Sequence, residues 1–301
     1  MNNESMAAGQ VRFFTLVGSK EGARLARLAI DSLRAFGGEW AACPVQVFVA
    51  REAPVSAAFA GLAGVDLLSL ELDEAFRYPF AAKVYAAAQA EALADPGIRS
   101  LVWLGPSCLV VNPPGRFALD PAHDAALRAV HIQNVGSPAG EPLDDFWQAI
   151  YRAIGVDEVP FTVESFVDGQ RLRPYFNSHC FASNPATGLL GAWWEYFQGM
   201  VSDRAFQAGA CRDELHQIFL HQAILSALVA KWLDRQRIDL LPADYSYPLH
   251  FQERIPPAYR ASTLDGLTCP VYEEAADLSA LPAGEPLRSW LAARGVSLPG
   301  S

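Results

Sequence analysis

Short apolar runs and longer helix-like segments follow one another along the N-terminal half of the chain. The runs Val11–Val17, Pro44–Ala50 and Val65–Leu72 have the length and the apolar content of buried strands. Residues 21–38 repeat apolar residues at helical spacing, residues 80–97 are rich in alanine, and both segments end in glycine. Strands that alternate with helices predict a mainly parallel sheet covered by helices on both faces.

The pattern continues beyond residue 97. Further strands are expected within Arg99–Val111, within Asp124–Ile132 and near residues 175–185, and further helices at 187–201 and 211–233. The length of 301 residues is sufficient for one large α/β domain with a substantial core.

Two regions depart from this pattern. Residues 133–173 are long and mostly irregular, which is typical of a lid or a binding loop. Within them, Asp144 and Asp145 precede a short helical pattern and form a cap-like pair. We therefore predict a single domain over 1–255 with a lid at about 133–173, followed by a C-terminal tail over 256–301 that wraps the surface and ends in one short helix.

Composition and charge exclude several classes of protein. Apolar residues make up 51% of the chain and charged residues 19%, as in folded globular proteins. The net charge of −10, without a basic cluster, argues against a nucleic-acid partner. No apolar segment reaches the ~20 residues that span a bilayer, and the N-terminus does not resemble a secretory signal, so we expect a cytoplasmic protein without a membrane span. The five cysteines lack C-x-x-C spacing, which disfavours a disulfide framework or a zinc site.

Ligands of open α/β sheets bind at the carboxyl ends of the strands, so the residues that follow each predicted strand are the candidate site. These residues are polar but include few carboxylates. They are Gly18, Ser19 and Lys20, then Gly105 to Ser107, His131 to Asn134, Asn177 to His179, and Tyr245 to His250.

The order of several short motifs resembles a known family. Lys83 precedes a VWL strand, a YFNS motif follows, a later helix carries His221 and Gln222, and the stretch LPADYSYPLH ends at His250. This order resembles the GT-A nucleotide-diphospho-sugar glycosyltransferases, especially the glycogenin-like and lipopolysaccharide-galactosyltransferase-like branch, from about Val11 to Phe251. The resemblance implies a GT-A-like, mainly parallel central sheet flanked by helices, a nucleotide-sugar donor, and an acceptor, not identified by the sequence, under the lid.

The resemblance also reveals a departure. In that family, the strand that matches LVWLGPSCLVV usually ends in Asp-x-Asp, whose carboxylates hold Mn²⁺ or Mg²⁺ against the diphosphate. Here the two positions are Gly105 and Ser107. His250 resembles the histidine that completes the metal site, but a single imidazole would bind a metal poorly. We therefore expect no Mn or Mg cofactor and no metal-binding residue.

The resemblance assigns the candidates to two groups. For each candidate, the alternative is a purely structural role without ligand binding, in a turn, as a helix cap or on the solvated surface. His179 stands where the family usually has glycine, so it should narrow the sugar pocket or contact a phosphate. Trp147 is the aromatic residue expected to touch an acceptor. The expected nucleotide and diphosphate side comprises Gly18, Ser19, Lys20, Lys83, Gly105 and Ser107, and the expected sugar side comprises Asn177, Ser178, His179, His221, Gln222 and His250.

Three functional hypotheses follow. The first is a glycosyltransferase-like protein that transfers a sugar from a nucleotide-sugar without the usual metal site. The second is a catalytically inactive GT-A-fold binding or scaffold protein. A nicotinamide-dependent enzyme is disfavoured, because LVGSKEG after the first strand lacks G-x-G-x-x-G spacing.

Overall fold

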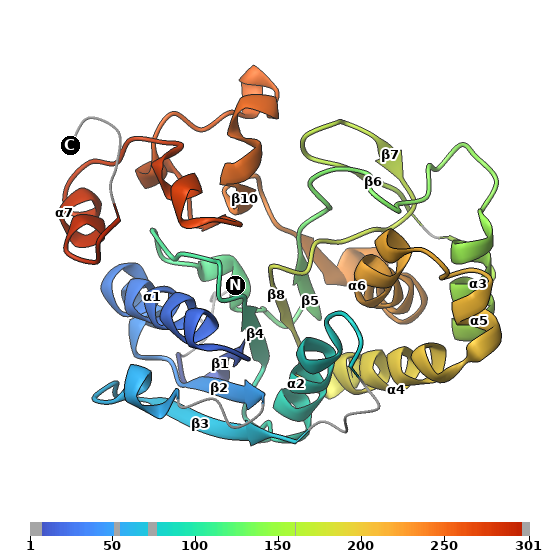
Figure 1. Cartoon of the computed structure of the whole chain (residues 1–301), viewed down its shortest axis with the longest axis horizontal. Helices are drawn as coiled ribbons and strands as arrows, with labels where there is room; N and C mark the ends of the chain where they lie inside the picture. Colours follow the sequence, from blue (N-terminus) through green and yellow to red (C-terminus); the bar gives the residue numbers. More distant parts are fainter. Residues whose placement is uncertain (1–7, 51–54, 72–76, 160, 297–301) are drawn as a thin grey trace.

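A seven-stranded sheet forms the centre of the protein (Figure 1). The computed structural model describes residues 8–50, 55–71, 77–159 and 161–296. The strand order is β3-β2-β1-β4-β8-β5-β9, and only β8 runs antiparallel to its neighbours, so the prediction of a mainly parallel sheet is confirmed. The strands are β1 (Val11–Val17), β2 (Val45–Ala50), β3 (Val65–Leu70), β4 (Ser100–Leu104), β5 (Ala125–Leu127), β8 (Cys180–Ser183) and β9 (Ile238–Leu240).

Helices cover both faces of this sheet. On one face, α1 packs on Phe13 and Val47, and on the other α2, α4 and α6 enclose Phe14 and Phe48. Successive residues of a strand point to opposite faces, so Phe13 and Phe14 belong to different cores. Figure 1 shows α2, α4 and α6 as one group, apart from α1. The helices are α1 (Lys20–Phe36), α2 (Ala81–Ala92), α3 (Asp145–Ile154), α4 (Leu189–Ser202), α5 (Arg204–Ala208), α6 (Glu214–Trp232) and α7 (Leu287–Ala292).

The alanines of α2 allow α4 to pack closely against it. Ala86, Ala87 and Ala90 are fully buried in the core that contains α4. At the end of α2, the carboxylate of Glu91 accepts hydrogen bonds from the backbone N–H groups of Leu190 and Gly191, at 3.1 and 2.7 Å. Glu91 thus satisfies N–H groups at the start of α4 that have no partner within the helix.

The region 133–173 and the C-terminal tail both have regular structure. The first contains α3 and a hairpin of β6 (Val163–Glu164) and β7 (Arg171–Leu172), and Asp144 caps α3 as predicted. The tail contributes β11 (Cys269–Val271), which pairs in parallel with β10 (Tyr245–Pro248), and it ends in α7. Tail leucines such as Leu264 and Leu291 are buried in a third apolar cluster, which includes Leu28 of α1.

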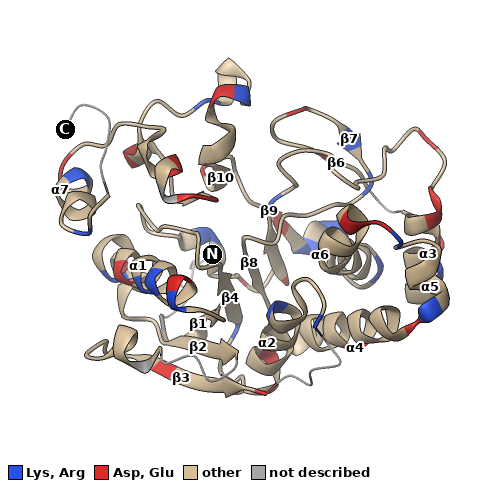
Figure 2. Cartoon of the chain, in the orientation of Figure 1, with Lys and Arg blue, Asp and Glu red and all other residues tan. Residues whose placement is uncertain are grey.

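Charged residues are paired or dispersed. Figure 2 shows acidic and basic residues interspersed along α1 and scattered over the other elements, so within the described residues no element carries a concentrated basic face. No helix in the described part of the chain combines the length and the hydropathy needed to cross a bilayer.

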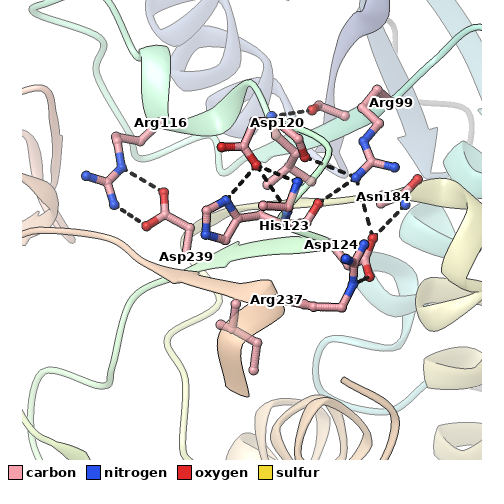
Figure 3. Close-up of polar contacts among 12 residues, drawn as sticks. Arg99, Arg116, Asp120, His123, Asp124, Asn184, Arg237 and Asp239 are labelled. Atoms are coloured by element: carbon pink, nitrogen blue, oxygen red, sulfur yellow. Dashed lines mark hydrogen bonds and ion pairs between the residues drawn. The ribbon is translucent and has the colours of Figure 1, made fainter. Parts of the chain in front are cut away.

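A network of ion pairs joins the strand ends at one edge of the sheet (Figure 3). Asp124 precedes β5, and its carboxylate accepts hydrogen bonds from Nε of Arg237, before β9, and from Nδ2 of Asn184, after β8, the latter at 2.8 Å. Arg99, before β4, lies 3.7 Å from the same carboxylate. The hydrogen bond from Arg237 is the main cause that lowers the pKa of Asp124.

Replacing Asp124 should therefore destabilise the fold in a pH-dependent way. Because the folded-state pKa is lowered, the stabilisation is present above the unfolded value of about 3.9 and is lost as the pH falls through the folded-state pKa. We expect Asp124→Asn to lower the free energy of unfolding by about 1–3 kcal/mol at neutral pH, with the difference from wild type shrinking in acid. Urea unfolding across this pH range measures it. Asp157→Asn, at a side chain that is 94% exposed, is the control and should have little effect; equal losses in the two variants would contradict the assignment.

Candidate functional site

A cavity of about 650 Å³ opens at the carboxyl ends of β1 and β4. Leu16 of β1 and the turn Gly105–Ser107 after β4 line it, together with Asn177–His179, which lead into the antiparallel strand β8. Side chains of α2 and α6, residues of the segment 130–134, His250, Phe251 and residues of the tail complete the lining. This is the edge of an open α/β sheet where ligands usually bind.

The cavity brings together most of the site residues predicted from the sequence. Gly18, Ser19 and Lys20 do not line it. They form the turn after β1 and the first residue of α1, where the Ser19 hydroxyl caps the helix by accepting a hydrogen bond from the Gly22 N–H. The predicted residues that line the cavity are Lys83, Gly105, Ser107, Asn177, Ser178, His179, His221, Gln222 and His250.

The expectation for Trp147 is wrong. Its side chain is 0% exposed, and its indole Nε1–H donates a 2.6 Å hydrogen bond to the carbonyl of Val135. The ring packs edge-on against Tyr151 and Tyr175 in the core. The apolar positions of α3 repeat at helical spacing, and this core pattern was the signal that should have outweighed its place in an irregular segment.

Lys83 is a buried cation without a carboxylate partner. Its ammonium donates hydrogen bonds to the backbone carbonyl and, at 2.7 Å, to the hydroxyl of Ser178, and no ion pair to it is found within the described residues. The ammonium also lies 5.3 Å from the ring centroid of Trp103. Burial disfavours the charged form and lowers the pKa of Lys83 to about 7.

Several histidines surround this cation. The rings of His131 and His179 stack with centroids 5.4 Å apart, and His250 is 6.0 Å from His131. The Asn177 side-chain oxygen accepts hydrogen bonds from Nδ1 and the backbone N–H of His179, which fixes that ring. Burial lowers the pKa of His179 to about 3 and lowers the pKa values of His131 and His250 as well. The buried imidazoles therefore act as neutral hydrogen-bonding groups at neutral pH.

His221 belongs to a second polar group, beside Lys83. Its Nε2 lies 3.1 Å from the Ser178 hydroxyl, and its Nδ1–H donates to the carbonyl of Ile218 at 2.9 Å. The same hydroxyl lies 3.4 Å from Oε1 of Gln222. Burial and the nearby Lys83 both lower the pKa of His221. A hydroxyl and an amide, which can both donate and accept hydrogen bonds, thus converge in one corner of the cavity with an imidazole whose Nε2 accepts.

The backbone at Gly105 has no room for a side chain. Its N–H donates a 2.9 Å hydrogen bond to the carbonyl of His179, and a Cβ at this position would lie 2.7 Å from that carbonyl oxygen. An aspartate at position 105 would therefore require β4 and β8 to move apart. Within the described residues, no group of three or more His, Cys, Asp or Glu side chains is arranged to hold a metal ion.

Backbone strain is concentrated around the cavity. The described non-glycine residues with positive φ are Phe80, at 62°, Asn134, at 46°, and Ser246, at 50°. Phe80 and Asn134 line the cavity, and the carbonyl of Ser246 lies 2.7 Å from Nε2 of the lining residue His131. Such conformations persist only where the surrounding structure holds them, and they are frequent at functional sites.

Sequence reasoning missed some lining residues. Phe80 lies in a predicted helix and Trp103 in a predicted strand. Nothing in the sequence of either segment indicates that these two residues line a cavity. Tyr272 and Glu273 follow β11 in the tail, which was expected to lie on the surface. The strand-like run before them, ending in acidic residues, was the available signal.

Comparison with known proteins identifies the fold. No protein-family model matches the chain, and no curated protein matches it significantly. Solved structures do match. The galactosyltransferase LgtC, in complex with donor and acceptor sugar analogues, is 13% identical over 96% of this chain and 98% of that chain, with a TM-score of 0.56. An active-site mutant of LgtC is 14% identical over 87% of both chains, with a TM-score of 0.53.

A third similar structure is that of a larger protein. The apo structure of the bifunctional glycosyltransferase WbbM is 11% identical over 88% of this chain, with a TM-score of 0.51, and the match spans 46% of that chain. At these identities the likeness establishes the architecture alone. The chain has the fold of GT-A-type glycosyltransferases, as predicted.

The burial of Lys83 makes a prediction about stability. Between its folded-state pKa of about 7 and its usual value of 10.5, the unfolded chain holds more protons on this residue, so the free energy of unfolding should rise with pH across this window. We expect Lys83→Met to remove that contribution, so that the variant gains most over wild type near pH 7 and least near pH 10. Urea unfolding at several pH values tests this. Lys231→Met, at an exposed lysine of α6, should keep the wild-type slope, and a wild-type slope in Lys83→Met would refute the prediction.

The close approach at Gly105 gives a second prediction. Gly105→Ala should lower the free energy of unfolding by about 1–3 kcal/mol, because the added methyl group collides with a backbone carbonyl that cannot turn aside. Gly140→Ala is the control, since a Cβ at Gly140 meets open space and its φ is not positive. Denaturant midpoints of both variants test the difference, and equal midpoints would show that β4 and β8 separate easily.

Proposed function

We propose that the chain is a glycosyltransferase that binds a nucleotide-sugar in this cavity and transfers the sugar to an acceptor without the Asp-x-Asp metal site. The observation that carries the proposal is a buried lysine without an ion pair in the cavity at the carboxyl ends of the central strands, where Gly105 and Ser107 stand at the positions that the resemblance matches to Asp-x-Asp. The volume of about 650 Å³ suits a small-molecule ligand.

Lys83 takes the part that a metal ion would otherwise have. A diphosphate next to its ammonium would favour the charged form and raise the pKa back above neutrality. The same charge would then stabilise the negative charge that builds on the diphosphate as the sugar departs. Because Ser178 is the hydrogen-bond partner of Lys83, the ammonium is held in place without being neutralised.

The neutral groups of the cavity suit the sugar. Ser178 and Gln222 can donate hydrogen bonds to sugar hydroxyls and accept hydrogen bonds from them, and Nε2 of His221 can accept. Asn177 and the histidine pair His179 and His250 extend this polar surface. Gly18, Ser19 and Lys20 remain candidates for the nucleotide, since they follow the lining residue Leu16 and end at the N-terminus of α1, where backbone N–H groups favour anions. The acceptor would enter beside Asn134, in the region 133–173.

A second candidate function is a non-catalytic binding protein of the same fold. The observation that favours it is the scarcity of acid–base groups: Glu273 is the carboxylate among the described lining residues, and its side chain is 68% exposed. A catalytic base needs to be held within hydrogen-bond reach of its proton, and an exposed side chain is poorly held.

A thermal-shift panel tests the proposal. UDP, GDP, CMP and their sugars are each added to the chain with Mn²⁺ and, separately, with EDTA. We expect one nucleotide series to raise Tm by about 2–4 °C at saturating concentration, equally in both conditions. Lys83→Ala should abolish the shift, while Lys231→Ala, far along α6, should preserve it. The Tm of each variant is compared with and without ligand, so that the effect of the mutation on the Tm of the ligand-free protein cancels.

The other outcomes are distinct. A shift that requires Mn²⁺ would show that a metal site exists despite Gly105 and Ser107. A shift without release of UDP, GDP or CMP from the corresponding sugar donor, in the presence of acceptor glycans or of water, would favour the binding protein. No shift with any nucleotide would refute the proposed donor.

A further inference from the structure

Phe80 occupies an unfavourable position by two criteria. It is the residue before α2, with φ 62° and ψ 7°, a left-handed conformation that is a true outlier for a bulky side chain. Its side chain makes no capping hydrogen bond, so it does not stabilise the N-terminus of α2 in that way. The residue is also 47% exposed although it is a large apolar side chain. Folding alone therefore gives little reason for phenylalanine at this position.

The surroundings of the ring point to a ligand. Its centroid lies 4.2 Å from that of the His221 imidazole, with the planes inclined by only 23°, so the ring is stacked on one side. The Lys83 ammonium is 5.7 Å from the ring centroid. Phe80 lines the cavity, so part of its exposed surface faces the ligand space. A ring backed by a second flat group and open to a cavity is a preformed stacking surface.

We propose that Phe80 is the platform on which the pyranose ring of the sugar stacks through its C–H face, an inference that rests on the proposed function and specifies its substrate contact. The C–H hydrogens of a pyranose carry partial positive charge, and the face of an aromatic ring is negative. The hydroxyls at the rim of the same sugar would reach the polar corner formed by Ser178, Gln222 and His221. That corner can both donate and accept hydrogen bonds, as each sugar hydroxyl does.

Saturation-transfer NMR with simple glycosides tests the platform without a nucleotide. The probes are methyl galactoside, methyl glucoside and methyl mannoside, added to the wild-type chain and to Phe80→Gly, Phe80→Trp and Trp232→Ala. Glycine suits φ 62°, so Phe80→Gly should fold at least as stably as wild type, and Phe80→Asn serves as a second variant because asparagine also tolerates this region. Trp232 is a similarly exposed aromatic residue outside the cavity.

We expect saturation of the ring C–H protons of at least one glycoside by the wild-type chain, retained in Phe80→Trp and Trp232→Ala. In Phe80→Gly and Phe80→Asn the affinity should fall roughly 10-fold. Equal signals from wild type and Phe80→Gly would overturn the platform, and so would the absence of a signal from every glycoside.

The thermal-shift panel, repeated with Phe80→Gly, separates this inference from the proposed function. If nucleotides stabilise the chain and the glycoside signals do not depend on Phe80, the donor site stands and the platform is wrong. If no nucleotide binds but the glycoside signals depend on Phe80, the platform stands and the proposed donor is wrong. If UDP without a sugar loses as much affinity in Phe80→Gly as its sugar derivatives lose, Phe80 stacks on the base and the sugar assignment is overturned.

Discussion

The contact between β4 and β8 determines what this site can contain. The antiparallel strand β8 enters the sheet beside β4, and the N–H of Gly105 meets the carbonyl of His179 at 2.9 Å where the two strands begin to diverge. This approach leaves no space for a side chain at 105. The same stretch of backbone delivers Ser178, whose carbonyl and hydroxyl hold Lys83. One pairing of strands thus excludes a carboxylate side chain from position 105 and holds Lys83 nearby.

The polar character of the cavity follows from this arrangement. Burial keeps the imidazoles of His131, His179 and His221 neutral, because the cost of charge in a low-dielectric environment exceeds what their backbone hydrogen bonds recover. Lys83 is the exception that titrates near neutrality. The cavity therefore offers many neutral hydrogen-bonding groups around one conditional positive charge. Such a lining suits a ligand with several hydroxyls and a single anionic part.

Much of the fold was predictable because its signals are local. Composition and the spacing of apolar residues predict strands in runs such as Val11–Val17 and a helix in the alanine-rich segment around Lys83. The carboxyl ends of the predicted strands then indicate where a ligand binds, without any tertiary information. Pairings between distant segments were not predictable in this way. Burial of Trp147 depends on α3 packing into the core, and the entry of Glu273 into the cavity depends on β11 pairing with β10. The short motifs predicted several of the residues that line the cavity. The protonation states of these residues depend on burial, which the sequence does not indicate.

The absence of carboxylates at 105 and 107 and the lowered pKa of Lys83 are two aspects of one electrostatic design. An aspartate pair lining the same cavity would attract the ammonium, hold its pKa high and occupy its hydrogen-bonding capacity. Without the pair, no carboxylate offsets the cost of burying the charge, and this cost lowers the pKa of Lys83 to about 7. An anionic ligand would remove that cost when it binds. By linkage, the amine of Lys83 would then take up a proton in those molecules in which it had been neutral. The lowered pKa of Lys83 is thus the feature on which the proposed function depends, because a phosphate-bearing ligand would supply the negative charge that the cavity lining does not place beside the ammonium.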